Sequence, residues 1–244
     1  MKVKLVITDL TRMQRGMVCI AGYSEAGQCI RPILPPPGIS ERSLVIENKP
    51  IIYPFAQIEL ELLTPTPKPP HNEDVHFNPW SARFVGEVRE RESILQQSLF
   101  KSVGAVFEQP IHDDFGFYVI DCQGPRSLGT VIPTTVVRVK YEKDKSGAWD
   151  YRLWFYDRVD TFYRLKITDL TWQYYCSSLR GPEVDQAKIA ANLTQIVKSR
   201  KVYLRLGLAR GWKEFPNRCY LQITGIYTFP DYLEGKTFFD FKPK

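Results

Sequence analysis

The stretch from Lys198 to Tyr220 alternates cations with aromatic rings and contains a single acid, Glu214. Guanidinium and ammonium groups neutralise backbone phosphates and release counterions, and aromatic rings or arginine planes stack on unpaired bases. The pattern therefore predicts contacts to single-stranded or distorted nucleic acid rather than to regular duplex. We assign the phosphate contacts to Arg205, Arg210, Lys213 and Arg218, and the stacking contacts to Trp212 and Tyr220.

The same segment has a second interpretation, in which Trp212 and Tyr220 belong to the hydrophobic core and the cations form a solvated rim. A smaller group near the N-terminus places Arg12 and Arg31 on either side of Tyr23 and predicts a second, smaller nucleic-acid contact. The alternative for these two arginines is pairing with local carboxylates.

Motifs of known catalytic and cofactor sites are absent from the sequence. The chain has no GxxxxGK[ST] phosphate loop, no GxSxG turn and no HExxH helix, so we expect no cofactor and assign no catalytic residue. Loop 71–76 holds His71 and His76 with two acids between them, and imidazole with carboxylate suits zinc, nickel or iron. Because no third histidine is near, we expect a solvated loop without metal.

The net charge of +6 is distributed unevenly along the chain. Residues 123–244 hold 21 basic and 12 acidic side chains, whereas residues 1–122 hold 12 basic and 15 acidic ones. A basic excess on one part of a chain indicates a polyanionic partner for that part. The sequence has no apolar run of the roughly 20 residues that a membrane span needs. Five widely spaced cysteines without a CxxC pair are typical of a reducing compartment, so we expect a cytoplasmic location and no membrane contact.

The composition, with 18 prolines, 15 glycines and 13% aromatic residues, favours many short strands and turns. The proline-rich segment 64–79 predicts a loop, and helices are expected at 84–103 and 181–201. Alternating or apolar-rich segments predict strands near 1–9, 16–23, 28–34, 51–63, 115–122, 131–141, 149–156, 161–170, 202–208 and 218–228.

The pentapeptide Ile-Thr-Asp-Leu-Thr occurs at 7–11 and again at 167–171, each time after a strand-like approach. Such internal similarity indicates duplication, with 161–170 as the repeated strand. Each half offers four or five short strands and an inserted helix, which is the inventory of an OB-type barrel. We therefore predict a mainly β fold with inserted helices, made of two tandem OB-like β-barrels in residues 1–128 and 129–244, the second more basic.

Several segments of the chain are similar to a known family. Segments 6–13, 16–22 and 29–33 resemble the opening of bacterial proteins called dual OB-containing domain proteins, and segments 206–210 and 219–231 resemble their closing part. The resemblance implies two OB-like barrels in tandem and a nucleic-acid-sensing role in bacterial conflict or defence systems. No catalytic residue is carried over from it.

The preferred interpretation is a nucleic-acid-binding module without an active site of its own, in which the C-terminal barrel forms the groove. Two alternatives stay open. One is a metal-dependent enzyme acting on nucleotides or nucleic acid through loop 71–76, and the other is a protein–protein adaptor whose basic patch contacts an acidic partner. The sequence does not distinguish DNA from RNA.

Overall fold

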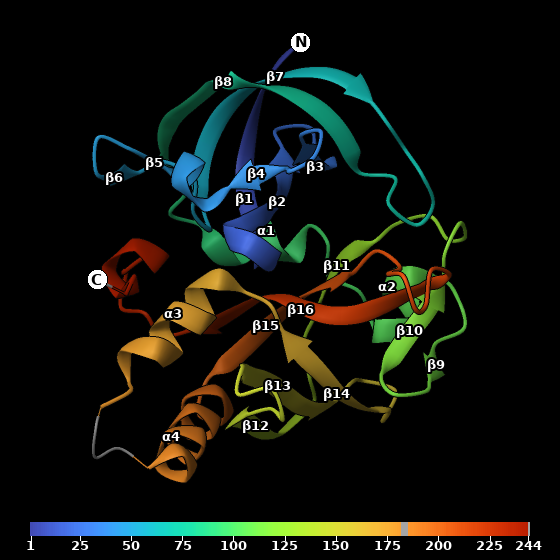
Figure 1. Ribbon diagram of the computed structural model, residues 1–244, viewed down its shortest axis with the longest axis vertical. Helices are drawn as coiled ribbons and strands as arrows, with labels where there is room; N and C mark the ends of the chain where they lie inside the picture. Colours follow the sequence, from blue (N-terminus) through green and yellow to red (C-terminus); the bar gives the residue numbers. More distant parts are fainter. Residues whose placement is uncertain (182–184, 244) are drawn as a thin grey trace.

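Apart from a two-stranded ribbon, the strands form two curled sheets that lie one above the other along the long axis of the molecule (Figure 1). The computed structural model describes residues 1–181 and 185–243. Part of the predicted 181–201 helix falls on residues 182–184 and lies outside this description. Among the described residues, no helix is both long enough and apolar enough to cross a membrane.

The first sheet closes into a barrel of five strands. Strand β1 hydrogen-bonds to both β7 and β2, so the order β1-β7-β8-β3-β2 returns to β1, and only the β3–β8 pair is parallel. This connectivity is that of an OB barrel. The strands are β1 (Lys2–Arg12), β2 (Met17–Ser24), β3 (Cys29–Ile33), β7 (Ala56–Pro65) and β8 (Asp74–Glu87). Between β3 and β7 the chain forms β4 (Ile39–Ser40), η2 (Glu41–Leu44) and the ribbon β5 (Val45–Ile46) with β6 (Lys49–Pro50).

The second sheet has the same connectivity but remains a half-barrel. Its order is β11-β15-β16-β14-β13-β12, again with one parallel pair, β14–β16. The edge strands β11 and β12 are successive pieces of chain, so they correspond to one first strand interrupted at 132–134. The strands are β11 (Leu128–Val131), β12 (Thr135–Lys143), β13 (Trp149–Tyr156), β14 (Phe162–Ile167), β15 (Lys201–Leu208) and β16 (Arg218–Phe229).

Helix α4 (Gln186–Lys198) packs against β12, at the side where the half-barrel is open. The Val139 amide donates to the Thr194 hydroxyl at 2.9 Å, and the buried Ile189, Leu193 and Val197 join the core. Helix α3 (Leu170–Ser178) precedes it, and both occupy the place between the third and fourth strands where an OB fold carries its helix. The helix therefore completes the core where strand pairing does not.

The remaining elements connect and extend the sheets. Short helices α1 (Arg91–Gln96) and α2 (Val103–Phe107) follow the first barrel, and η3 (Phe238–Phe241) packs on α3 near the C-terminus. The hairpin of β9 (His112–Asp113) and β10 (Phe117–Ile120) is added to the second sheet, because β10 pairs with the start of β16.

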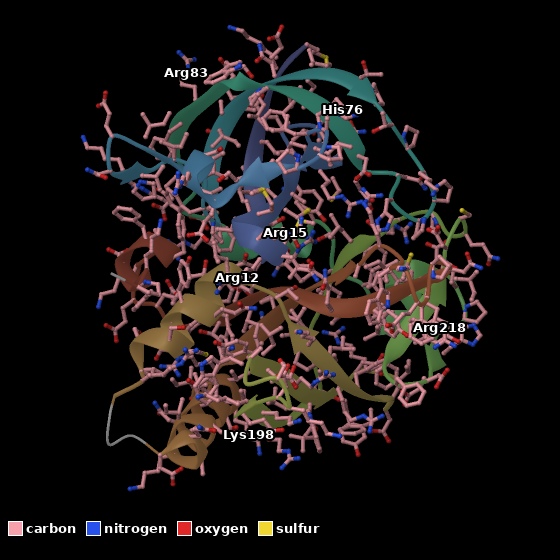
Figure 2. All side chains as sticks on the ribbon, viewed as in Figure 1. Arg12, Arg15, His76, Arg83, Lys198 and Arg218 are labelled. Atoms are coloured by element: carbon pink, nitrogen blue, oxygen red, sulfur yellow. The ribbon has the colours of Figure 1, made fainter. Side chains whose placement is uncertain are left out.

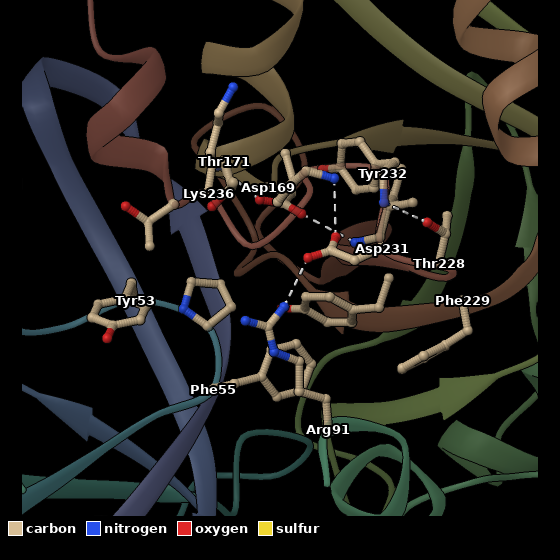
Figure 3. Close-up of a pocket in the computed structure, with 15 residues that line it drawn as sticks. Tyr53, Phe55, Arg91, Asp169, Thr171, Thr228, Phe229, Asp231, Tyr232 and Lys236 are labelled. Atoms are coloured by element: carbon tan, nitrogen blue, oxygen red, sulfur yellow. Dashed lines mark hydrogen bonds and ion pairs between the residues drawn. The ribbon is translucent and has the colours of Figure 1, made fainter. Parts of the chain in front are cut away.

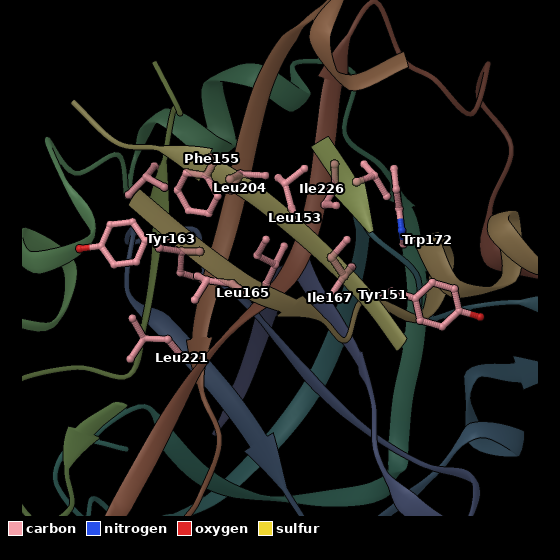
Figure 4. Packing of buried hydrophobic residues seen from close by; sticks show 14 of the residues in the cluster. Tyr151, Leu153, Phe155, Tyr163, Leu165, Ile167, Trp172, Leu204, Leu221 and Ile226 are labelled. Atoms are coloured by element: carbon pink, nitrogen blue, oxygen red, sulfur yellow. The ribbon is translucent and has the colours of Figure 1, made fainter. Parts of the chain in front are cut away.

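Alternation along β13 and β14 divides the two faces of the second sheet. The inner residues, among them Leu153, Phe155 and Leu165, are buried in one cluster (Figure 4). Their neighbours in sequence therefore point outward. The same alternation builds the core of the first barrel from Leu5, Ile20 and Ile58 and similar residues.

Two predicted elements are wrong, and both lie around β8. Residues 74–87 form a strand, where a loop was expected up to 79 and a helix from 84. The pairing jumps from Glu61↔Asn78 to Glu59↔Arg83, so residues 79–82 bulge out of the ladder. Pro79 is tolerated there because a bulge does not require its missing N–H. The sheets also divide the chain between β8 and β9, because residues 112–131 pair within the second sheet, and not at the predicted 128/129 boundary.

The repeated pentapeptide does not occupy equivalent places in the two barrels. Its first copy lies in β1, the first strand of one barrel, and its second copy follows β14, the third strand of the other. The two copies instead meet each other, since Thr11 bridges to Asp169 and the Arg12 amide donates to the Thr168 carbonyl at 2.8 Å. The two barrels share their strand connectivity, but the repeated pentapeptide does not mark equivalent positions in them.

Candidate nucleic-acid interface

OB barrels bind ligands on the outer face of their second and third strands, between the loops that follow the first and fourth strands. In the first barrel these strands are β2 and β3. Their outward side chains Ala21, Tyr23 and Arg31 are 1%, 4% and 5% exposed. The face is closed because the second barrel covers it.

Arg205 is the main contact that closes this face. Its side chain is fully buried and binds both oxygens of Asp9, with the shortest contact at 2.8 Å from Nη2. Nη1 also donates to the hydroxyls of Tyr23 at 2.9 Å and Thr130 at 3.1 Å, and Thr224 donates to Asp9. The predicted phosphate contact by Arg205 is therefore wrong in this structure, because its guanidinium holds the two barrels together and reaches no solvent.

The predicted contact by Arg31 is also wrong, because its side chain is buried in an ion pair within the first barrel. Its Nε donates to Asp74 at 2.6 Å, and both side chains are buried. Arg210 reaches the same Asp74 carboxylate from the second barrel, with half of its own side chain exposed. Glu73 accepts from the amide and the hydroxyl of Ser127, each at 2.8 Å. The loop after the fourth strand of the first barrel is thus part of the contact between the barrels.

Loop 71–76, which holds the two histidines, takes part in the same contact between the barrels. His71 is buried, and burial lowers the pKa of its imidazole to about 2. The carboxylates of Glu73 and Asp74 already bind the second barrel and the arginines. Among the described residues, no three His, Cys, Asp or Glu side chains gather as metal ligands would.

The corresponding face of the second barrel is open and cationic. Strand register places Lys140 opposite Arg152, which lies opposite Lys166. The next row is Arg138, Trp154 and Arg164. We call these six outward side chains the cationic grid: Arg138, Lys140, Arg152, Trp154, Arg164 and Lys166.

Acids lie at the edges of the grid. Glu142 and Asp150 are paired in the row beyond Lys140 and Arg152. Glu142 lies 2.7 Å from Lys140, and Asp150 lies 2.8 Å from Arg152 and 3.8 Å from Lys140. Asp113 from the β9–β10 hairpin lies 3.0 Å from Arg164. Arg138 stacks on the Trp154 ring, with its Cζ 3.7 Å from the ring centroid, and within the described chain neither Arg138 nor Lys166 forms an ion pair. The grid therefore combines free cations with an aromatic plane.

A hollow of about 290 Å³ lies over the grid. Lys140, Arg152, Trp154 and Arg164 line it from the sheet, and the hairpin turn at 115–117 lines it from the side. Phe115, at the tip of this turn, is 95% exposed. The hollow is thus bounded by cations and by exposed aromatic surface.

Three predicted residues flank the grid in and after the β15–β16 loop. Trp212 is 54% exposed, Lys213 is exposed, and Tyr220 is half-buried against Tyr118, with the ring centroids 5.7 Å apart. This loop follows the fourth strand of the second barrel, which is a ligand-binding position in OB folds. Tyr220 lies on the same barrel face as the grid, because Lys166 is paired with Gln222, two residues beyond Tyr220. Trp212 is connected to this position through Phe215, whose ring centroid lies 5.9 Å from that of Trp212 and 6.4 Å from that of Tyr220.

Arg218 belongs to the same flank. Its guanidinium lies 4.5 Å from the ring centroids of both Tyr118 and Phe215 and 2.9 Å from Asp114. Hydrogen bonding to Tyr220 and Asp114 raises the pKa of Arg218. Arg12, in contrast, lies beside helix α3 over the Tyr174 ring, well away from Arg218 (Figure 2). Arg12 is therefore not part of this surface.

A second cavity lies at the seam between the barrels and holds the other repeated aspartate (Figure 3). Asp169 accepts from the amides of Thr171, Trp172 and Ile226, and burial raises its pKa to about 7. Arg91 is already paired with Asp231 at 2.8 Å across this cavity. With a volume of about 30 Å³, the cavity has room for roughly one water molecule.

Sequence reasoning missed the grid, although its signal was present. The alternation of 149–156 predicts a strand, and it places Arg152 and Trp154 on the same face of that strand. Their significance depends on the neighbours Arg138, Lys140, Arg164 and Lys166, which only strand register supplies.

Comparison with known proteins agrees with this architecture. No curated protein matches the chain. The family model described as dual OB-containing domain matches residues 3–226, which run from the start of β1 into β16 and so span both barrels. The open barrel face is that of an OB-fold binding module. From its strand connectivity and this match, we conclude that the chain belongs to the dual OB-containing domain family.

Proposed function

We propose that the protein binds single-stranded nucleic acid on the cationic grid, with the β15–β16 loop as a flank. The observation that carries this proposal is the row Lys140–Arg152–Lys166, in which like charges face each other directly across two strand pairs. Like charges directly opposite each other destabilise a sheet, and the acids Glu142 and Asp150 reach Lys140 and Arg152 but form no ion pair with Lys166. A polyanion on this face converts that repulsion into attraction.

The aromatic content of the face favours nucleic acid over other polyanions. Trp154 lies in the grid, and Tyr156 and Phe162 form the next row along the same strands. Base–aromatic stacking requires an unpaired base and contributes about 1–3 kcal/mol per base. This requirement favours a single strand over a duplex, whose bases are stacked on each other.

The salt dependence of binding tests the proposal. Log affinity for a single strand changes with log salt by about 0.7 per neutralised phosphate. Replacing Lys140, Arg152 and Lys166 by Gln should therefore weaken binding of a labelled oligothymidylate and reduce the slope by about 2. A matched variant replaces three exposed cations of the first barrel, Arg42, Lys49 and Arg89, and should change neither quantity. If both triple variants behave alike, binding follows net charge alone and the grid is not the site.

The finer parts of this function are also proposals. A sensing role in bacterial conflict or defence systems rests on the family resemblance, and binding without catalysis rests on the absence of a catalytic motif in the sequence. The adaptor and metal-enzyme alternatives have no specific observation in their favour on this face.

A further inference from the structure

The β9–β10 turn places an aromatic ring at the hollow over the grid. Phe115 is 95% exposed and has a φ of 55°. A bulky residue in this left-handed region is uncommon and strained. A strained, exposed phenylalanine contributes nothing to the core, so at the edge of this hollow its ring is available for a contact outside the protein chain.

The turn is held in place against the sheet by residues on both of its sides. Asp113 pairs with Arg164 of the grid at 3.0 Å, and Asp114 pairs with Arg218 at 2.9 Å. Gly116, with a φ of 145°, lies against the Tyr220 ring, where an added Cβ would be 3.4 Å from Cδ1. The position of Phe115 is therefore set by the same surface that carries the grid.

We propose that Phe115 and the Arg138–Trp154 stack form a clamp for one unpaired nucleobase, with Lys140, Arg152 and Arg164 around its phosphates. All of these residues except Arg138 line the one hollow, and Arg138 stacks on Trp154. The clamp rests on the proposed function and deepens it, because it makes affinity depend on bases as well as on phosphates. The substrate class is then a single-stranded nucleic acid, as distinct from a sulfated sugar or polyphosphate of equal charge.

The clamp is tested with two strands of equal charge. One probe is a labelled ten-residue oligothymidylate, and the other is an abasic strand of the same length. Phe115→Ala should weaken oligothymidylate binding about tenfold, which is 1.4 kcal/mol, and leave the abasic strand unaffected. Phe115→Tyr keeps the ring and should restore the affinity. Trp80→Ala, which removes an equally exposed aromatic side chain from β8 of the first barrel, is the matched control and should change neither affinity.

Failure of the clamp and failure of the proposed function give different results. If the native protein binds both strands with a grid-dependent salt slope but Phe115→Ala changes neither affinity, the clamp is refuted and the grid stands. Equal affinity of the native protein for the two strands likewise overturns the clamp. If the native protein binds neither strand, both proposals are refuted.

Discussion

Replacing Arg205 by Met should lower the free energy of unfolding of the protein and leave its affinity for oligonucleotides unchanged. Arg205 and Asp9 have side chains 0% and 3% exposed, so the substitution leaves a carboxylate buried without its cation. Removing one partner of a buried pair costs about 3–5 kcal/mol. The hydroxyls of Tyr23 and Thr130 also lose the guanidinium to which they are hydrogen-bonded. If the substitution costs about 4 kcal/mol and the urea m value is about 2.5 kcal/mol/M, the urea concentration at the midpoint of unfolding should fall by roughly 1.5 M.

A double-mutant cycle separates the pair from other effects of the substitution. Asp9→Asn alone should also destabilise, whereas the combined variant should recover about 2 kcal/mol relative to the sum of the single changes. Urea unfolding followed by tryptophan fluorescence measures all four proteins, and oligothymidylate titrations at two salt concentrations are made on the folded variants. The reasoning fails if Arg205→Met costs less than about 1 kcal/mol and at the same time flattens the salt slope, since Arg205 would then face the ligand.

Three further predictions concern other parts of the molecule. Lys166→Glu should raise stability by about 0.2–1 kcal/mol, because it places an opposite charge beside Arg152, and it should weaken oligonucleotide binding. Thermal melts measure the first effect and oligonucleotide titrations the second, with Lys49→Glu as the control variant in both. Burial lowers the pKa of His71 to about 2, so the unfolded chain binds a proton below its usual value near 6.5 and the folded chain does not. Stability should therefore fall by about 2 kcal/mol between pH 7 and pH 5, and His71→Leu should abolish that part of the slope in urea melts. Gly22→Ala would place a Cβ 2.1 Å from the Val6 carbonyl oxygen and should lower stability by about 3 kcal/mol, as a reduced melting temperature would show.

The sequence predicted most strands but not which strand faces meet solvent. Leu204-Arg205-Leu206 alternates as a strand with an outward arginine should, and Arg205 does point out of its own barrel. The other barrel lies there, so the outward direction leads into the interior of the molecule. Alternation reports the two faces of one sheet, and it carries no information about a neighbouring domain.

Of the predicted residues that flank the grid, Trp212 and Lys213 lie in a loop, and Arg218 and Tyr220 lie at the start of β16. Trp212 and Lys213 stay exposed because the β15–β16 loop extends beyond the barrel contact. The grid was missed for the opposite reason. Its residues lie on three strands, with paired residues 10 to 16 positions apart in the sequence. They form rows only through a register that includes the β-bulge between Val136 and Arg138. Local sequence pattern therefore identifies candidate residues in one loop more readily than candidate residues spread over a sheet.

The uneven charge of the chain follows from how the barrels use their faces. Asp9, Glu73 and Asp74 of the acidic half bind Arg205, Ser127 and Arg210 of the basic half. The second barrel thus covers the face of the first barrel on which OB folds bind ligands, and its buried Arg205 contacts that face as a ligand would. Part of the basic excess is neutralised in that contact and cannot serve nucleic acid. Among the basic side chains that stay accessible, those of the cationic grid lie on the face of β12, β13 and β14. The first barrel does not cover this face, so the pairing of the barrels closes one of the two OB ligand faces and leaves the other open.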